Sequence, residues 1–211
     1  MKNIVIIGSG GLATEVKCLI DAINRNQPQW NLLGFIDDWD KRKGDEIIDG
    51  YKITGTTEDL NNVKEELYAI IAFGNPPYIK EAAEKIRNPL IKFANLIHPS
   101  VEINSSQHMG QGNVFCFGTF ISCNVTIGDF NILNFKCIVA HDAQIGSFNV
   151  FHPDVRISGS VSVGDHNLFG MNTSVYQGIR IGDENKFGAY SFVTRNINNR
   201  ESLFGIPAKK M

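Results

Sequence analysis

The sequence places a histidine directly before an aspartate, at His141 and Asp142. A carboxylate beside an imidazole can orient the ring and make it more basic, which suits a general base near neutral pH. The pair is flanked by two apolar residues, Val139 and Ile145. Because histidine–aspartate pairs also occur in solvated turns, the pair by itself leaves a catalytic and a structural interpretation open.

The remaining histidines and the cysteines do not predict a metal site. No two of the five histidines have a His-x4-His spacing, and the four cysteines show neither a CxxC motif nor another zinc-binding spacing. We therefore expect no metal and no catalytic thiol. The cysteines are interpreted as reduced, small core residues, at Cys18, Cys116, Cys123 and Cys137.

A glycine-rich segment near the N-terminus could bind a phosphate. The apolar run Ile4–Ile7 is followed at once by Gly8, Ser9, Gly10 and Gly11. Glycines at a strand-to-helix turn expose backbone N–H groups to a phosphate. The same residues fit a dinucleotide fingerprint, which would indicate a nicotinamide-dependent protein, or a tight turn that only packs a helix on a sheet.

Residues 1–94 show the alternation of an α/β domain. Helical spacing of apolar residues predicts helices over 12–23 and 80–86, and short apolar runs predict strands over 4–7, 32–36 and 68–73. Asp37 and Asp38 follow the second strand, and Gly74 and Asn75 follow the third. This order implies a small parallel sheet with crossover helices, about half of a full dinucleotide-binding (Rossmann) sheet.

From residue 97 onward the sequence has a period of six. Seventeen consecutive sextet positions are apolar, at 97, 103, 109, 115, 121, 127, 133, 139, 145, 151, 157, 163, 169, 175, 181, 187 and 193. Neither a helix nor an alternating strand requires this period, so the residues indicate a repeat architecture.

A period of eighteen lies on top of the period of six. It relates the glycines 110, 128, 146, 164 and 182, the asparagines 113, 131, 149, 167 and 185, and the column Phe115, Leu133, Phe151, Phe169 and Phe187. Three sextets per coil predict a three-sided parallel β-helix over 95–211, with the tail from Leu203 outside the register. We expect the glycines to supply backbone freedom at a corner, the asparagines to form an amide ladder and the aromatic rings to stack.

The overall composition excludes several classes of partner. The 211 residues carry a net charge of −2 without a basic stripe, so we expect neither a nucleic-acid partner nor an anionic membrane surface. No apolar run is long enough to span a bilayer, and the N-terminal apolar stretch is too short for a signal peptide. We therefore expect a cytoplasmic protein.

Several segments together resemble one family over nearly all 211 residues. They are Gly8–Gly11, Gly34–Asp38, Ala72–Asn75, Asn95–Ser100, Asn134–Gly146 and Gly205–Lys209. The chain resembles the sugar O- and N-acyltransferases of the left-handed β-helix (hexapeptide-repeat) superfamily. This family includes sialic acid O-acetyltransferases and N-acetyltransferases of UDP-linked 4-amino sugars, and it serves bacterial surface glycan biosynthesis.

The resemblance implies transfer of an acetyl group from acetyl-CoA, without a metal, by a homotrimer that holds the coenzyme between neighbouring β-helices. His141 would be the general base, Asp142 would orient it, and Asn134 would shape the acceptor site. The coenzyme side would include a backbone N–H near Gly159 as oxyanion donor, together with Gly170 and with Lys209 or Lys210 near the phosphates.

The resemblance also assigns the N-terminal residues to a nucleotide-sugar site. Its residues would be Gly8, Gly10, Gly11, Asp37, Asp38, Gly74 and Asn75. The chain departs from the family pattern at Leu12, at Ile79 and at Val150, where relatives often carry histidine, arginine and histidine. These departures fall on the acceptor side, so they leave the acceptor sugar open.

We expect N-acetylation of a nucleotide-linked amino sugar. The alternatives are O-acetylation of a sialic-acid-like sugar and a nucleotide-sugar-binding scaffold without turnover. The nicotinamide-dependent interpretation of the glycine-rich turn also stays open.

Overall fold

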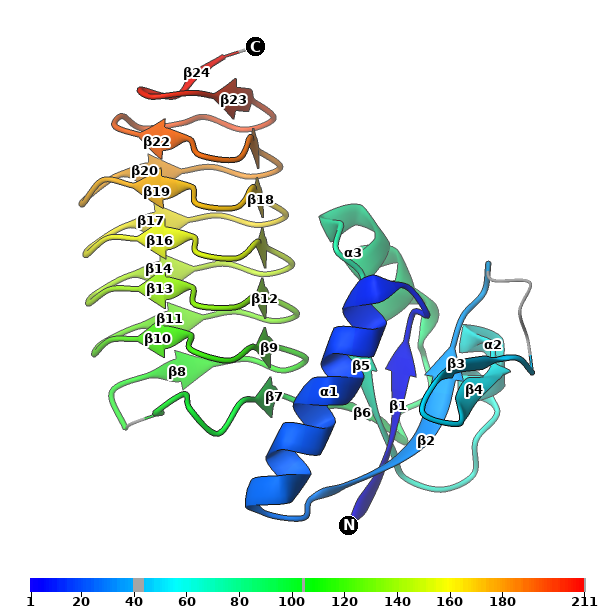
Figure 1. Ribbon diagram of the computed structural model, residues 1–211. Coiled ribbons are helices and arrows are strands. Elements are labelled where there is room, and N and C mark those ends of the chain that lie inside the picture. The colour runs from blue at the N-terminus through cyan, green and yellow to red at the C-terminus, as the bar shows by residue number, and fades with distance from the viewer. Residues whose placement is uncertain (40–43, 104, 211) are drawn as a thin grey trace. The chain divides into compact units, whose positions relative to one another are not determined.

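The computed structural model describes residues 1–39, 44–103 and 105–210. The chain forms two compact units, Met1–Leu96 and Ile97–Met211 (Figure 1). The boundary expected between residues 94 and 95 lies two residues from this division, and the predicted second domain contains Asn104 and Met211, which lie outside the described residues. The predicted order, an α/β unit followed by a left-handed parallel β-helix, is confirmed.

The first unit is a six-stranded sheet in the order β3-β4-β2-β1-β5-β6. All neighbouring strands are parallel except β3 and β4. The strands are β1 (Lys2–Ile7), β2 (Trp30–Ile36), β3 (Glu46–Ile48), β4 (Tyr51–Gly55), β5 (Leu67–Ile71) and β6 (Ile91–Phe93), and the helices are α1 (Gly11–Asn26), α2 (Thr57–Asn61) and α3 (Pro76–Lys85).

The helices follow from local sequence rules. Helix α1 buries Val16, Leu19, Ile20 and Ile23, which recur at helical spacing. Helix α3 begins at Pro76, four residues before the predicted start, because proline fits the first turn of a helix. The prediction missed β3, β4, β6 and α2, which have three to five residues each and are too short to show a period.

The second unit has three flat sides, each made of short parallel strands from successive coils. Side 1 contains β7 (Leu96–Ile97), β9 (Val114–Phe115), β12 (Ile132–Leu133), β15 (Val150–Phe151), β18 (Leu168–Phe169), β21 (Lys186–Phe187), β23 (Ser202–Phe204) and the antiparallel β24 (Lys209–Lys210). Side 2 contains β10 (Phe120–Ile121), β13 (Ile138–Val139), β16 (Arg156–Ile157), β19 (Ser174–Val175) and β22 (Phe192–Val193). Side 3 contains β8 (His108–Met109), β11 (Thr126–Ile127), β14 (Gln144–Ile145), β17 (Ser162–Val163) and β20 (Arg180–Ile181).

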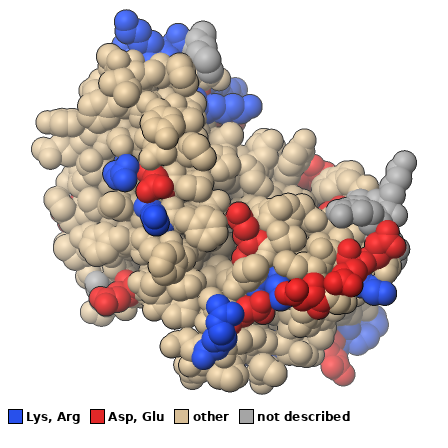
Figure 2. All heavy atoms as spheres, in the orientation of Figure 1, with Lys and Arg blue, Asp and Glu red and all other residues tan. Residues whose placement is uncertain are grey.

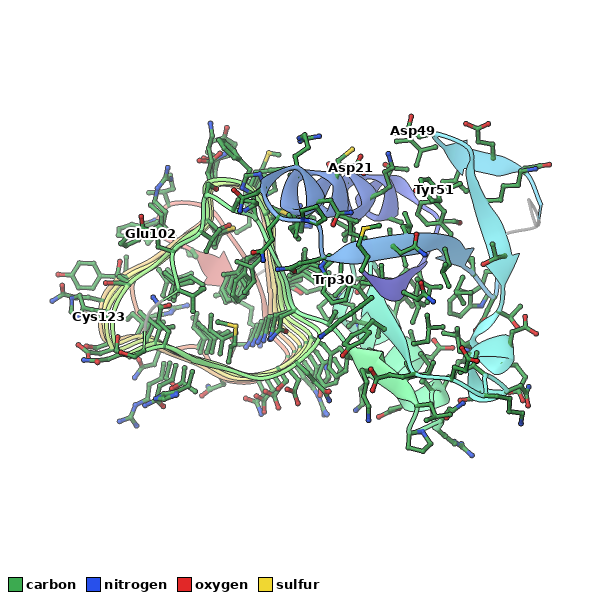
Figure 3. All side chains as sticks on the ribbon, turned by 90° about the horizontal axis from the view of Figure 1, so that it is seen from below. Asp21, Trp30, Asp49, Tyr51, Glu102 and Cys123 are labelled. Carbon is green, nitrogen blue, oxygen red and sulfur yellow. The ribbon has the colours of Figure 1, made fainter. Side chains whose placement is uncertain are left out.

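Residues eighteen apart stack in columns, some inside the β-helix and some outside it (Figure 3). The rings of Phe151 and Phe169 are stacked with centroids 4.8 Å apart, and those of Phe169 and Phe187 are 4.7 Å apart. The amide ladder is also present, since Asn149 Nδ2 donates to Asn131 Oδ1 over 3.1 Å and Asn167 continues to Asn149 over the same distance. Both predicted ladders are therefore confirmed.

The expected role of the periodic glycines was wrong. None of the glycines at 110, 128, 146, 164 and 182 has a positive φ. A Cβ on Gly128 would lie 2.8 Å from the carbonyl oxygen of Gly146, so these positions need glycine because successive coils approach closely. The left-handed residues lie elsewhere, at every sixth position from Gly112 to Tyr190, and they include Asn124 and Asp142.

The prediction that all four cysteines are core residues was also wrong. Cys116 and Cys137 are buried, whereas Cys18 and Cys123 are exposed. Burial raises the pKa of the Cys137 thiol to about 12. Cys123 lies on an outer corner of the β-helix (Figure 3). Within the part of the chain that the structure describes, no helix is long and apolar enough to cross a membrane.

Candidate active site

His141 and Asp142 occupy the corner that joins side 2 to side 3, directly after β13. The His141 Nδ1 lies 2.8 Å from Asp142 Oδ2, and the two side chains are 60% and 51% exposed. An ionised carboxylate can only accept a hydrogen bond, so Nδ1 carries the proton and donates it to Asp142. This tautomer leaves the lone pair on Nε2, which is the atom that a general base needs.

The carboxylate of Asp142 is held in its ionised form. The hydrogen bond with His141, followed by one from Asn124 Nδ2 over 3.1 Å, lowers the pKa of Asp142 below its ordinary value. The backbone is fixed as well, because Asp142 N donates to Cys123 O over 3.1 Å and His141 O accepts from Ser160 N over 2.9 Å. Coils on both sides therefore position the pair.

Gly159 stands one coil beyond His141, at the equivalent position of the same corner. A Cβ at Gly159 would lie 2.6 Å from both Cε1 and Nε2 of His141, so only glycine leaves room for the imidazole in its observed position. Among the described residues, the Gly159 N–H makes no hydrogen bond. The side of Gly159 that would carry a Cβ therefore faces the edge of the ring that carries Nε2.

Asn134 and Gly170 lie at a different corner, between sides 1 and 2. They share one column, two coils apart, while His141 lies at the other end of side 2. Asn134 is 8% exposed, and its Oδ1 accepts from Phe135 N over 2.8 Å. A single chain therefore brings His141, Asp142 and Gly159 together but does not bring Asn134 or Gly170 to them.

The remaining residue predicted on the coenzyme side is near the C-terminal end. Lys209 and its neighbour Lys210 are exposed and form β24, which pairs with β23. Both ammonium groups are thus accessible to an anion, and the predicted phosphate contact stays a prediction.

The substrate-binding residues predicted in the first unit converge at the carboxyl ends of three adjacent strands. β1 ends before Gly8, β2 ends before Asp37, and β5 is followed closely by Gly74. The chain adds β2 on one side of β1 and later adds β5 on the other side. The order of the strands therefore changes direction between β1 and β5. Open α/β sheets bind ligands at such a switch point.

The two helix N-termini at this edge differ in their capacity to bind an anion. Helix α1 begins with Gly10 as N-cap without a side-chain cap, and a Cβ at Gly10 or Gly11 would meet nothing within 4 Å. Both glycines are exposed, and the first N–H groups of a helix have no partner within the helix. Helix α3 begins with Pro76 and Pro77, which have no N–H to donate.

The other predicted residues of this edge have distinct surroundings. Gly8 has a φ of +110°, and a Cβ there would lie 3.0 Å from the ring of Phe73, so this glycine is required by packing whatever else it binds. Gly74 is open on the side where a Cβ would project. Asn75 is the N-cap of α3, makes no side-chain cap, and has a buried Oδ1 without a partner among the described residues.

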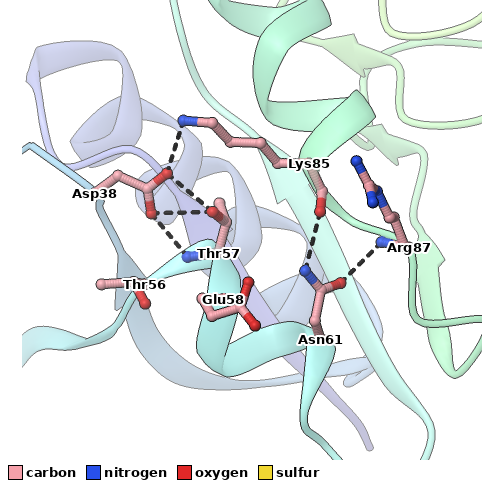
Figure 4. A pocket seen from close by; sticks show the side chains of 7 residues that line it. All are labelled: Asp38, Thr56, Thr57, Glu58, Asn61, Lys85 and Arg87. Atoms are coloured by element: carbon pink, nitrogen blue, oxygen red, sulfur yellow. Dashed lines mark hydrogen bonds and ion pairs between the residues drawn. The ribbon is translucent and has the colours of Figure 1, made fainter.

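The two aspartates of the predicted site have different environments. Asp38 accepts from Thr57 N over 2.8 Å, from Thr57 Oγ1 and from Lys85 Nζ over 3.1 Å (Figure 4). Burial alone would raise the pKa of Asp38, but these bonds lower it. Asp38 thereby anchors α2 at the wall of a pocket of about 650 Å³ that also contains Asn61 and Arg87.

Asp37 belongs to a second pocket that the sequence did not reveal. Its other lining residues are Trp39, Phe73, Tyr78 and Glu81, around about 520 Å³. The ring centroids of Trp39 and Phe73 are 5.9 Å apart, and Tyr78 lies 6.4 Å from each. Trp39 is separated from Tyr78 by 39 residues, so no local pattern could predict this aromatic pocket.

Among the residues described, no group of three or more histidine, cysteine, aspartate or glutamate side chains is arranged to hold a metal ion.

Comparison with known proteins is consistent with both units. Residues 3–86 match the PglD N-terminal domain family. A curated relative, the UDP-N-acetylbacillosamine N-acetyltransferase of Bacillus subtilis strain 168, is 32% identical over 116 residues. This match covers 54% of the chain and 51% of that protein, so it spans about half the length of the relative.

Solved structures match over the whole chain. PerB from Caulobacter crescentus, in complex with CoA and GDP-perosamine, is 27% identical with a TM-score of 0.88, over 100% of this chain and 98% of that one. The acetyltransferase domain of PglB from Neisseria gonorrhoeae FA1090 shares the fold, with a TM-score of 0.88 and 23% identity over 100% of both chains. Over its whole length, the chain is therefore similar in fold to acetyltransferases with a left-handed β-helix. Its first unit is similar to the N-terminal domain of the PglD family.

The contact between Gly159 and the imidazole gives a direct test of the corner geometry. In Gly159→Ala, the added Cβ should displace the His141 ring and weaken its hydrogen bond to Asp142. Because that bond is the main cause that lowers the pKa of Asp142, the pKa should rise toward its ordinary value. Titration of the carboxyl carbon by NMR measures it. Gln177→Ala, in the same column one coil further, should leave the pKa unchanged, and an unchanged pKa in Gly159→Ala would contradict the described contact.

Proposed function

We propose that the protein transfers an acetyl group from acetyl-CoA to the amine of a nucleotide-linked amino sugar. The observation that carries this proposal is the His141 tautomer, with Nδ1–H bonded to Asp142 and the Nε2 edge of the ring packed against Gly159. The two relatives act on or were solved with nucleotide amino sugars, one linked to UDP and the other to GDP. An enzyme that uses acetyl-CoA in this way would act in the cytoplasm.

The geometry fits a direct transfer between two bound substrates. The acceptor amine attacks the thioester carbonyl carbon, and His141 Nε2 removes the proton that the nitrogen loses. The carbonyl oxygen gains negative charge, which the Gly159 N–H would stabilise. The C–S bond then breaks, and the departing CoA sulfur takes the proton from His141, so the products are an amide and the free thiol.

The first unit would hold the nucleotide part of the acceptor. The exposed N–H groups of Gly10 and Gly11 at the start of α1 suit the diphosphate. The rings of Trp39 and Tyr78 suit the face of a base, and Asp37 lies in the same pocket. We assign Asp38, which accepts from Thr57 and Lys85, to positioning α2. Asp37 accepts from Ser9 Oγ over 2.8 Å and lines the aromatic pocket, so it is the candidate for contact with the nucleotide.

The coenzyme would bind between two copies of the chain in a homotrimer. Asn134 and Gly170 lie at one corner and His141 at the next, so they can contribute to a single site only if they come from neighbouring subunits. Exposed apolar side chains gather on side 2 and the two corners that bound it: Phe117, Phe120, Phe135, Met171, Tyr176 and Tyr190. The face of the β-helix seen in Figure 2 carries few charged side chains. Lys209 and Lys210 would then meet the coenzyme phosphates.

Replacement of His141 tests the transfer. His141→Ala should reduce kcat about 10²- to 10⁴-fold because the proton acceptor is lost. The measurement is a coupled assay of CoA thiol release with a panel of UDP-, GDP- and dTDP-linked amino sugars. His166→Ala is the matched control, since His166 lies at another corner and stacks on Phe148.

The same assay separates the alternatives. Thiol release with sialic-acid-like acceptors and not with amino sugars would favour O-acetylation. Equal, slow release by the wild type and His141→Ala with every acceptor would favour a binding scaffold without turnover.

Trp39 provides a probe for nucleotide binding. It is 53% exposed whereas Trp30 is 8% exposed, so a base stacked in the aromatic pocket should quench the fluorescence of Trp39 and not of Trp30. Trp39→Leu should weaken nucleoside diphosphate binding by about tenfold, as expected for loss of one stacking partner. Calorimetry measures the affinity, with Leu33→Ala, on the strand that precedes Trp39, as control. Tight binding of NAD in place of nucleoside diphosphates would contradict the proposed ligand.

The introduction of a charged side chain on side 2 tests the proposed trimer. Phe120 is 58% exposed, and Phe120→Arg should convert the trimer into monomers and abolish transfer, because the completed site needs a neighbouring subunit. Analytical ultracentrifugation measures the assembly. Thr126→Arg, on side 3, is the control that should remain trimeric. A wild-type protein that sediments as a monomer at micromolar concentration would overturn the assembly.

A further inference from the structure

The histidine and aspartate form an exposed pair, which raises the question of what keeps the carboxylate turned toward the ring. An exposed ion pair or charged hydrogen bond contributes too little stabilisation to hold two mobile side chains in one geometry. Asp142 has two carboxylate oxygens, and His141 uses only Oδ2. The other oxygen therefore needs a partner of its own if the carboxylate is to be held.

Asn124 supplies that partner from the preceding coil. Its Nδ2 lies 3.1 Å from Asp142 Oδ1, eighteen residues away. An ionised carboxylate only accepts, so the atom that faces it must be the amide nitrogen. The two oxygens of Asp142 are thus held from opposite sides, by Asn124 and by His141.

Asn124 is itself fixed by its neighbours. Its backbone N donates to Ser106 Oγ over 3.1 Å, one further coil away. Its φ of 57° lies in the left-handed region, which asparagine tolerates better than most residues. A hydrogen-bonded column on the outside of the β-helix therefore leads to the His141 imidazole. It consists of Ser106, Asn124 and Asp142, which are eighteen residues apart.

We propose that Asn124 is a positioning residue for acetyl transfer, which holds the Asp142 carboxylate so that His141 keeps Nε2 free and directed at the acceptor. The inference rests on the proposed role of His141 as general base. Asn124 touches neither substrate in this scheme, so its loss should lower kcat and leave both KM values unchanged.

The test uses two substitutions that respect the left-handed backbone. Asn124→Gly removes the donor and keeps φ, whereas alanine would add strain of its own. It should lower kcat about three- to tenfold, which corresponds to the loss of one hydrogen bond. Asn124→Asp keeps the shape but places a second carboxylate against Asp142, so its effect on kcat should be larger.

A second readout does not need a substrate. The hydrogen bond from Asn124 contributes to the low pKa of Asp142, so NMR titration of the carboxyl carbon should show a higher pKa in Asn124→Gly and a still higher one in Asn124→Asp. His166→Gly is the matched control, because His166 has a similar φ of 59° at the corner between sides 3 and 1. It should change neither kcat nor the pKa of Asp142.

The outcomes distinguish the inference from the proposed function. If the wild type transfers acetyl groups and both Asn124 variants retain its kcat and its Asp142 pKa, the positioning role is overturned. A rise in KM together with a lower melting temperature would indicate a structural role and would also overturn it. If the wild type transfers nothing, the proposed function fails, and the pKa comparison alone decides whether Asn124 holds Asp142.

Discussion

The eighteen-residue register between coils is the constraint on which the second unit depends. Each coil satisfies its backbone through the next one, as when Ile132 N donates to Asn149 O and Asn134 N to Phe151 O. The buried asparagine ladder fixes this register further, because Asn131 Nδ2 reaches both Asn113 Oδ1 and Gly146 O. A slip of one residue would turn the asparagines away from their partners, which is costly for buried polar groups.

The same constraint decides where chemistry is possible. The interior is filled by columns such as Phe151 and Phe169, so reactive groups can lie only on the outer corners. There the register becomes useful, because residues eighteen apart are held against one another without any local motif. His141 receives its space from Gly159 on one side, and its carboxylate partner is bonded to Asn124 on the other.

The sequence predicts the parts that depend on periodicity and misses those that depend on distance. The period of six and the two ladders are visible because one geometry is repeated in every coil. The reason for the periodic glycines could not be predicted, since corner strain and close coil contact select the same residue. The aromatic pocket stayed hidden because Trp39 and Tyr78 meet only after β2 and β5 have both paired with β1. Asn124 could have been found by counting eighteen residues back from Asp142.

The two units place different physical demands on substitution. In the β-helix, a change at Gly128 or Asn149 disturbs the neighbouring coils and spreads along the register. At the carboxyl edge of the first sheet, Trp39 and Tyr78 stand beyond the strand ends and are both more than half exposed. Their replacement would alter a binding surface and leave the sheet hydrogen bonds intact. The surface around Trp39 and Tyr78 can therefore change in the first unit while the geometry that holds His141 and Asp142 in the second stays the same.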